Sequence, residues 1–184
     1  MDELALNILD IACNSVKAGA TLVAVTVAAD TKADKLTITV ADDGCGMTPA
    51  FAASVTDPFT TTRTTRKVGM GIPLFKMAAE LSGGGLTIDT EKGRGTTVTA
   101  EFGLTSVDRT PLGDLGSTMT VLIGGSPAID FTLTFRLDGD EYVFDTREVK
   151  AVLDGGDITE PETLRFIGDM ICENIENIKK GVYI

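Results

Sequence analysis

The 184-residue sequence contains no histidine. Histidine is the usual general base beside a nucleophilic serine, a common zinc ligand and the residue that carries phosphate in sensor kinases. Its absence excludes serine-histidine triads, the usual zinc catalysis and histidine phosphorylation within this chain. Any phosphorylated histidine must therefore belong to another protein.

Cysteines and long apolar runs are also scarce. The three cysteines are odd in number and far apart, which predicts neither a disulfide framework nor a zinc cluster: Cys13, Cys45 and Cys172. No apolar run reaches the roughly 18 to 20 residues that a membrane-spanning helix needs. The acidic start, Met1-Asp2-Glu3, does not resemble a signal peptide. We expect a cytoplasmic protein that has no contact with a membrane.

Basic residues are outnumbered by acidic ones, 16 to 27, which gives a formal net charge of -11. Residues 104–184 hold 7 basic and 15 acidic residues, so most of the negative charge lies in the second part of the chain. Affinity for nucleic acid comes largely from Lys and Arg side chains facing the phosphates. The composition therefore predicts no nucleic-acid partner, and solubility is the simplest explanation of the acidity.

Apolar periodicity and glycine positions divide residues 1–103 into alternating helices and strands. We expect helices over 3–18, 50–56 and 71–82, and strands over 21–29, 35–42, 85–90 and 96–103. The Thr- and Arg-rich residues 57–69 contain hardly any apolar side chains and predict a surface loop.

Residues 104–184 predict a smaller α+β region that packs against the first. We expect a helix from Pro111 to 123, a hairpin of strands 129–137 and 141–145, and helices over 146–153 and 161–180. The predicted fold is an α/β two-layer sandwich with a mixed sheet covered by helices on one face. The apolar stripe between Leu164 and Ile178 can either pack on the chain's own core or form a homodimer.

The first predicted helix is apolar around most of its circumference. The exception is a stripe of polar residues that recur at helical spacing, namely Asn7, Asp10, Asn14 and Lys17. A polar stripe on an otherwise buried helix needs a polar surrounding, which is either solvent at an exposed edge or a ligand.

Three glycine-containing segments follow this helix in order. They are Asp42-Asp43-Gly44-Cys45-Gly46 after a strand, Gly69-Met70-Gly71 before a helix, and Gly95-Thr96-Thr97 at the start of the last strand. Each one alone is most often an ordinary turn. With the helix motif Asn14-Ser15-Val16-Lys17-Ala18-Gly19-Ala20-Thr21, their order resembles the GHKL, or Bergerat-fold, ATPase and kinase superfamily across residues 4–102. Residues 58–74 are similar to the lid and second glycine box of histidine kinases.

The resemblance implies a site for ATP and Mg²⁺. Asn14 would be the magnesium ligand, and Asp42 would accept a hydrogen bond from the adenine amino group. The other residues that the resemblance places at the nucleotide are Lys17, Gly44, Gly46, Arg63, Lys67, Gly69, Gly71, Thr96 and Thr97. For Arg63 and Lys67 a solvated basic loop is an equal alternative.

Two departures from the family pattern bear on activity. Hydrolysing relatives carry a glutamate four residues before the asparagine, where this chain has the shorter Asp10 as its candidate general base. Pro73 stands in the second glycine box, where it stiffens the start of the helix. We expect an enzyme that transfers the γ-phosphate of ATP to a partner protein or slowly to water. The alternative is a nucleotide-responsive module that binds a partner protein without catalysis.

Overall fold

A computed structural model describes residues 3–56 and 70–184 of the chain. The helices are α1 (Leu4–Lys17), α2 (Pro49–Val55), α3 (Gly71–Leu81), α4 (Leu115–Gly125), α5 (Thr146–Leu153) and α6 (Pro161–Lys179). The strands are β1 (Leu22–Asp30), β2 (Lys35–Asp42), β3 (Gly85–Glu91), β4 (Gly95–Gly103), β5 (Asp130–Leu137) and β6 (Asp140–Asp145). Each of these elements was predicted from the sequence, and all bounds agree to within one residue except those of α4.

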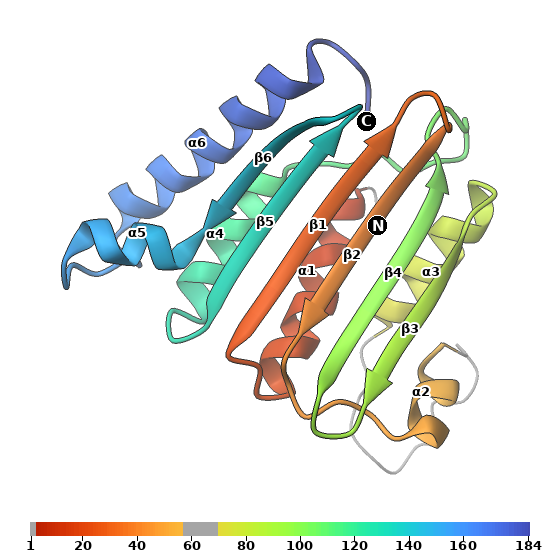
Figure 1. Cartoon of the computed structure of the whole chain (residues 1–184), viewed down its shortest axis with the longest axis horizontal. Helices are drawn as coiled ribbons and strands as arrows, with labels where there is room; N and C mark the ends of the chain where they lie inside the picture. The colour runs from red at the N-terminus through yellow and green to blue at the C-terminus, as the bar shows by residue number, and fades with distance from the viewer. Residues whose placement is uncertain (1–2, 57–69) are drawn as a thin grey trace.

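The six strands form one mixed sheet in the order β3-β4-β2-β1-β5-β6. Every neighbouring pair is antiparallel except β1 and β5, which run parallel with Leu22 opposite Asp130. Helices α1, α3 and α4 lie behind this sheet, and α6 packs beside α4 (Figure 1). The predicted two-layer α/β sandwich is therefore confirmed. Strands on both sides of the predicted boundary at residue 103 belong to the same sheet.

Alternation along the strands gives the sheet one covered and one open face. In β1, Val23, Val25 and Val27 are buried under the helices, while the residues between them are partly exposed. Successive side chains of a strand point to opposite faces, so this period of two fixes the register of the strand against the core. The hydrophobic core consequently lies between the sheet and the helix layer.

The turn between β5 and β6 has the conformation that its sequence predicts. The β5–β6 hairpin turns at Asp138 and Gly139, which have φ values of 51° and 100°. An Asp-Gly pair tolerates two successive positive φ values, which gives the turn that suits the twist of an antiparallel hairpin. The side chain of Asp138 also accepts a hydrogen bond from the Thr31 N–H at 2.8 Å, and this bond joins the β5–β6 turn to the β1–β2 turn.

Helix α4 begins four residues later than the predicted start at Pro111, so that prediction was wrong. The carbonyls of Pro111 and Leu112 accept hydrogen bonds from the N–H groups of Leu4 and Ala5, both at 2.8 Å, so residues 111 and 112 cap the start of α1 and do not form a helical turn. The helix starts instead after Asp114, whose carboxylate accepts the Ser117 N–H at 2.8 Å. Asp is a favourable N-cap, and this cap sets the boundary.

The apolar stripe of α6 is used inside the chain. Its central residues Ile167, Ile171 and Ile175 are buried, and Leu164 and Ile178 pack against the same core. Of the two alternatives for this stripe, packing on the chain's own core is the one observed. Among residues 3–56 and 70–184, no helix has the length and apolar character needed to cross a bilayer.

Candidate functional site

Asp42 is the centre of a hydrogen-bonded cluster at the end of β2. Its Oδ1 atom accepts the Gly44 N–H at 2.9 Å and the Thr96 N–H at 3.3 Å. Its Oδ2 atom accepts the Ser15 hydroxyl at 2.5 Å. Asp42 lies two residues after the buried Val40 and therefore points to the helix-covered face of the sheet. The three donors hold the carboxylate in a single orientation between α1 and β4.

Ser15 is a site residue that the sequence analysis missed. It follows Asn14 directly, but it lies on the face of α1 that turns toward the sheet with Ile8 and Ile11, and it is 4% exposed. A serine in an apolar face of a helix needs a polar partner, and that mismatch is the signal that identifies it. Here the partner is the Asp42 carboxylate.

The second acid of the Asp-Asp pair has a different role. The Asp43 carboxylate accepts the N–H groups of Thr21 and Leu22 at 2.7 and 2.9 Å, together with the Thr21 hydroxyl. The hydrogen bond from the Thr21 side chain, aided by these N–H groups, lowers the pKa of Asp43 below its ordinary value. Asp43 thus closes the connection to β1, and Asp42 alone faces the site.

Two glycines allow a close backbone contact around this cluster. A Cβ atom on Gly46 would lie 2.0 Å from the Glu91 carbonyl oxygen, and one on Gly95 would lie 1.9 Å from the Asp42 carbonyl oxygen. Both glycines also have positive φ values, 62° and 102°. Since any side chain would collide with backbone atoms, only glycine fits at either position. Gly44 is less restricted, because its Cβ would meet Ala18 and Asp42 atoms at 3.0 Å.

Thr90 holds the β3–β4 turn against the glycine loop, and the sequence analysis missed it as well. Its hydroxyl oxygen accepts the Met47 N–H at 2.9 Å, and the same hydroxyl donates to the Gly95 carbonyl at 3.0 Å. It also lies 3.0 Å from the Thr96 hydroxyl. A threonine near the end of a strand carries no distinctive sequence signal, because strand propensity already explains it.

The two predicted threonines point to opposite faces of the sheet. Thr96 lies opposite Asp42 in the β2–β4 ladder, whereas Thr97 lies opposite Ala41. Neighbouring residues of a strand alternate between faces, so only Thr96 joins the cluster on the helix-covered face. Thr97 lies on the open face instead.

Helix α1 brings Asp10 to the beginning of α3. A Cβ atom on Gly71 would lie 2.8 Å from the Asp10 Cβ and 3.4 Å from its Oδ2 atom, so the two helices nearly touch here. The N-cap residue of α3, Met70, makes no side-chain cap hydrogen bond. Among the described residues, the first N–H groups of α3 therefore have no side-chain acceptor like those that cap α2 and α4, and N–H groups at a helix start suit an anion.

Asn14 and Lys17 follow Asp10 along the same stripe of α1, and Asn7 precedes it. Asn14 is half-buried and its side chain makes no hydrogen bond to the residues that the structure describes. Lys17 is exposed in the last turn. Asn7 differs from the other three because it is 3% exposed. The predicted site residues Arg63, Lys67 and Gly69 lie outside the described residues.

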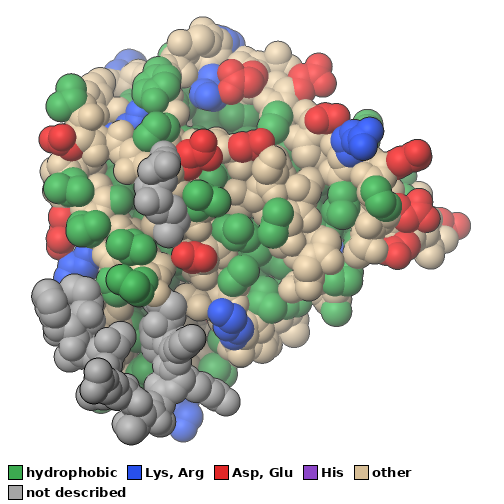
Figure 2. Space-filling view, turned by 180° about the vertical axis from the view of Figure 1, so that it is seen from behind, with side chains coloured by type: hydrophobic (Ala, Val, Ile, Leu, Met, Phe, Trp, Pro, Cys, Tyr) green, Lys and Arg blue, Asp and Glu red, His purple; other side chains and the backbone are tan. Residues whose placement is uncertain are grey.

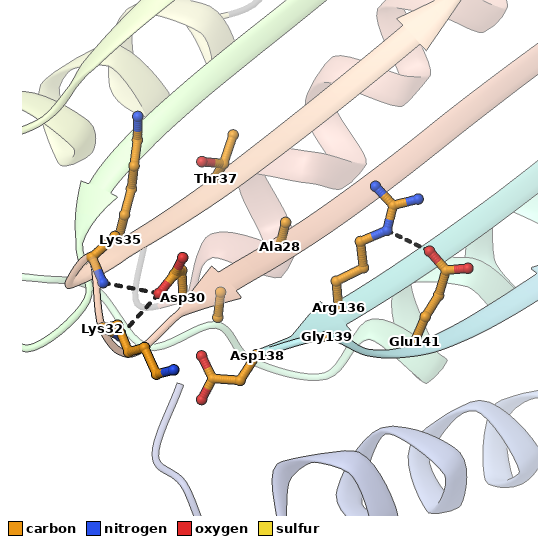
Figure 3. A pocket seen from close by; sticks show the side chains of 11 residues that line it. Ala28, Asp30, Lys32, Lys35, Thr37, Arg136, Asp138, Gly139 and Glu141 are labelled. Carbon is orange, nitrogen blue, oxygen red and sulfur yellow. Dashed lines mark hydrogen bonds and ion pairs between the residues drawn. The ribbon is translucent and has the colours of Figure 1, made fainter.

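An open cavity of about 700 Å³ lies far from this cluster, at the opposite end of β1 and β2. Figure 3 shows its floor of Ala28 and Thr37 and the charged side chains around it. The charges compensate one another, since Arg136 pairs with Glu141 and Lys35 pairs with Glu101. The cavity therefore has no excess charge of either sign with which to select a nucleotide.

Within the described chain, no group of three or more Cys, Asp or Glu side chains can hold a metal ion by itself. A cation beside Asn14 would need ligands from a bound molecule as well as from the protein. The Asn14 amide oxygen has the chemistry of a Mg²⁺ ligand, and phosphate oxygens are the partners that Mg²⁺ usually shares with a protein.

Comparisons with known proteins give a family and similar solved structures. Residues 1–106 match the family model described as histidine kinase-, DNA gyrase B-, and HSP90-like ATPase. A solved N-terminal domain of a DNA repair protein is similar, with a TM-score of 0.52 and 14% identity over 86% of this chain. This chain spans 59% of the length of that structure. The Aquifex aeolicus MutL ATPase domain complexed with ADP gives a TM-score of 0.48 and 17% identity, with 84% of this chain and 70% of that one covered.

Proposed function

Because the chain belongs to the family of histidine kinase-, DNA gyrase B- and HSP90-like ATPases, we propose that it binds ATP together with Mg²⁺ and transfers the γ-phosphate to a partner protein or slowly to water. The observation that carries the proposal is the Asp42 carboxylate, held by Ser15, Gly44 and Thr96 on the helix-covered face. Membership of this family indicates that the ligand is ATP. The contacts of individual residues, described in the following paragraphs, support the position that we propose for it.

Asp42 is suited to bind the adenine amino group. A carboxylate has about four acceptor positions, and three protein donors occupy three of them. The remaining position can accept one amino proton. Guanine presents a carbonyl oxygen at the corresponding place, and two acceptors facing each other repel. The bare backbone at Gly44 and Gly46 lets the flat base approach closely.

The phosphates would lie between α1 and the beginning of α3. The N–H groups at Gly71 and Ile72, at the start of α3, can donate to phosphate oxygens, and the positive end of the helix dipole favours negative charge there. Pro73 has no N–H, so this turn offers one donor fewer than a regular helix start. Asn14 would hold Mg²⁺, which neutralises phosphate charge when bound, and Lys17 adds a positive charge on the same stripe.

Asp10 would act as the general base for the acceptor. It lies one helical turn before Asn14 and next to Gly71, at the γ-phosphate end of the proposed nucleotide position. The acceptor is a hydroxyl or imidazole of a partner protein, or water, and the chain itself has no histidine. Transfer of this kind depends on positioning and charge more than on covalent chemistry by the protein.

Isothermal titration with ADP and a non-hydrolysable ATP analogue, with and without Mg²⁺, tests the binding site. We expect binding that strengthens with Mg²⁺. Asp42→Asn should weaken it about 100-fold, because the amide N–H₂ opposes the adenine amino group and each lost charged hydrogen bond is worth about 1.5–3 kcal/mol. Asn14→Ala should remove the effect of Mg²⁺. The matched control is Asp43→Asn, which changes the adjacent acid without affecting affinity; equal losses in both Asp variants contradict the assignment.

Turnover separates the enzyme from the alternative, a regulatory module that binds nucleotide and a partner protein without catalysis. Phosphate release from labelled ATP, alone and with candidate acceptor proteins, measures it directly. For the enzyme, Asp10→Ala should lower turnover about 100-fold while nucleotide affinity stays within about threefold. Tight Mg²⁺-dependent binding without turnover in the unaltered protein would identify the regulatory module.

A further inference from the structure

Asn7 is a buried amide for which the structure shows no hydrogen-bond partner. The described chain buries six polar or charged side chains, namely Asn7, Ser15, Ser82, Arg109, Thr118 and Thr146. Five of the six donate or accept a hydrogen bond. Among the described residues only Asn7, at 3% exposed, has none for its side chain. A buried amide that lacks partners costs free energy, so a role outside folding is the simplest reason for an asparagine at this position.

The exposed part of Asn7 includes its amide. No side-chain nitrogen or oxygen in residues 3–56 and 70–184 is fully enclosed without a partner, so the unbonded amide atoms must reach the surface. Asp10 follows three residues later on the same stripe of α1. A helical side chain leans toward the N-terminus of its helix, and the Asp10 side chain therefore lies over the turn that contains Asn7. The amide and the carboxylate are thus neighbours at the surface of α1.

The Asp10 carboxylate is not held by the rest of the described chain. It is exposed, and with the residues that the structure describes it forms neither a hydrogen bond nor an ion pair. Figure 2 shows the helix-covered side of the molecule, where the described Lys and Arg side chains are scattered rather than gathered into a cluster. A general base is effective when a third group holds it in position. Asn7 offers two amide N–H donors and the ionised carboxylate only accepts, so the two groups are complementary.

We propose that the Asn7 amide donates a hydrogen bond to the Asp10 carboxylate once nucleotide is bound, which makes Asn7 the positioning residue for the general base. The inference rests on the proposed function, in which Asp10 accepts the proton of the phosphate acceptor. One carboxylate oxygen accepts the Asn7 N–H, and the other faces the acceptor. Rotation of the two side chains is enough to form this bond, because residues spaced by three on a helix are neighbours. The negative phosphates repel the carboxylate and favour its approach to a neutral donor.

Asn14 is the other amide that could hold Asp10, because it lies four residues later on the same stripe. Its side chain also makes no hydrogen bond within the described residues, but it is half-buried, so water can satisfy the amide. Its oxygen is already assigned to Mg²⁺ in the proposed site. The cost of burying an amide without a partner therefore falls on Asn7, and a bond to Asp10 removes that cost.

Asn7→Leu separates positioning from a structural role. Leucine has a similar length and no polar atoms, so the urea midpoint of the variant should rise. Turnover at saturating Mg²⁺-ATP should fall about tenfold, less than for Asp10→Ala, while affinity for the non-hydrolysable ATP analogue stays within about threefold. Thr118→Val is the matched control, because its hydroxyl donates to the Asp114 carbonyl at 3.0 Å; its urea midpoint should fall and its turnover should not change. Asn7→Gln retains the donors and should keep more turnover than Asn7→Leu.

The double variant Asn7→Leu with Asp10→Ala decides whether Asn7 acts through Asp10. Its turnover should equal that of Asp10→Ala, because the base that Asn7 positions is already absent. If Asn7→Leu lowers turnover equally in both backgrounds, or not at all in the unaltered one, the proposal is overturned. A lower urea midpoint that accompanies the loss of turnover indicates a structural role and also overturns it. When the unaltered protein binds nucleotide without turnover, the enzymatic function and this inference fail together; when its turnover is normal, only the inference fails.

Discussion

Replacing Gly46 by alanine tests how closely two backbone segments approach at the Asp42 cluster. The new Cβ atom would lie 2.0 Å from the Glu91 carbonyl oxygen and 3.0 Å from the Gly95 carbonyl oxygen. Two costs add: about 1–2 kcal/mol for a positive φ in a residue with a Cβ atom, and about 1–3 kcal/mol for forcing the β3–β4 turn away. We expect the free energy of unfolding to fall by about 2–5 kcal/mol.

Gly93→Ala is the matched control for this change. Gly93 lies in the β3–β4 turn that Gly46 contacts and has a φ of 85°, but a Cβ atom there meets nothing within 4 Å. This variant has only the conformational cost, about 1–2 kcal/mol. Urea unfolding followed by circular dichroism measures both variants, and nucleotide titration should show weaker binding for Gly46→Ala only. Equal destabilisation of the two variants would refute the argument that backbone contact, rather than φ alone, selects glycine at Gly46.

Two further predictions concern hydrogen bonds to carboxylates. Ser15→Ala removes the only described side-chain donor to Asp42, so adenine-nucleotide affinity in titration should fall about tenfold while stability changes by about 1 kcal/mol. Unchanged affinity would mean that Ser15 does not orient Asp42. Acid should destabilise the fold. The folded-state pKa values of Asp43 and Asp145 are lowered, chiefly by side-chain hydrogen bonds from Thr21 and Arg147. The stability that these carboxylates contribute above about pH 4 is therefore lost as the pH falls through the lowered pKa values. Urea midpoints between about pH 6 and pH 3 measure this loss, and Thr21→Val should flatten it.

The helices and strands could be predicted from the sequence because the residue pattern that favours each element also defines its buried face. The alternation of Val23, Val25 and Val27 gives both the strand and its covered face. The glycines that end helices and the Asp138-Gly139 turn mark the boundaries of the elements. The pairing of β5 with β1 was not accessible, because either edge of a short apolar sheet offers the same backbone donors and acceptors to a new strand.

The site was only partly accessible for a similar reason. Residues that carry a motif, such as Asp42 and Gly46, were assigned to the candidate site from their order and spacing. Ser15 and Thr90 were missed because their roles depend on which side chain lies opposite in space, and one sequence does not contain that distance. Thr97 was assigned to the site along with Thr96, although the alternation of a strand separates them. The start of α4 was misplaced because the carbonyls of Pro111 and Leu112 bond to α1.

The parallel contact between β1 and β5 has a consequence for the order of events during synthesis. The β1 residue Leu22 pairs with Asp130. More than half of the chain must therefore be synthesised after β1 before its second edge is covered. At translation rates of about 5–20 residues per second, that interval lasts roughly 5–20 seconds. From the completion of β4 until β5 is made, the nascent sheet β3-β4-β2-β1 ends in a largely apolar edge of Val and Ala residues that can pair with neighbouring chains. The arrival of β5 therefore protects the nascent protein from aggregation as well as completing its sheet.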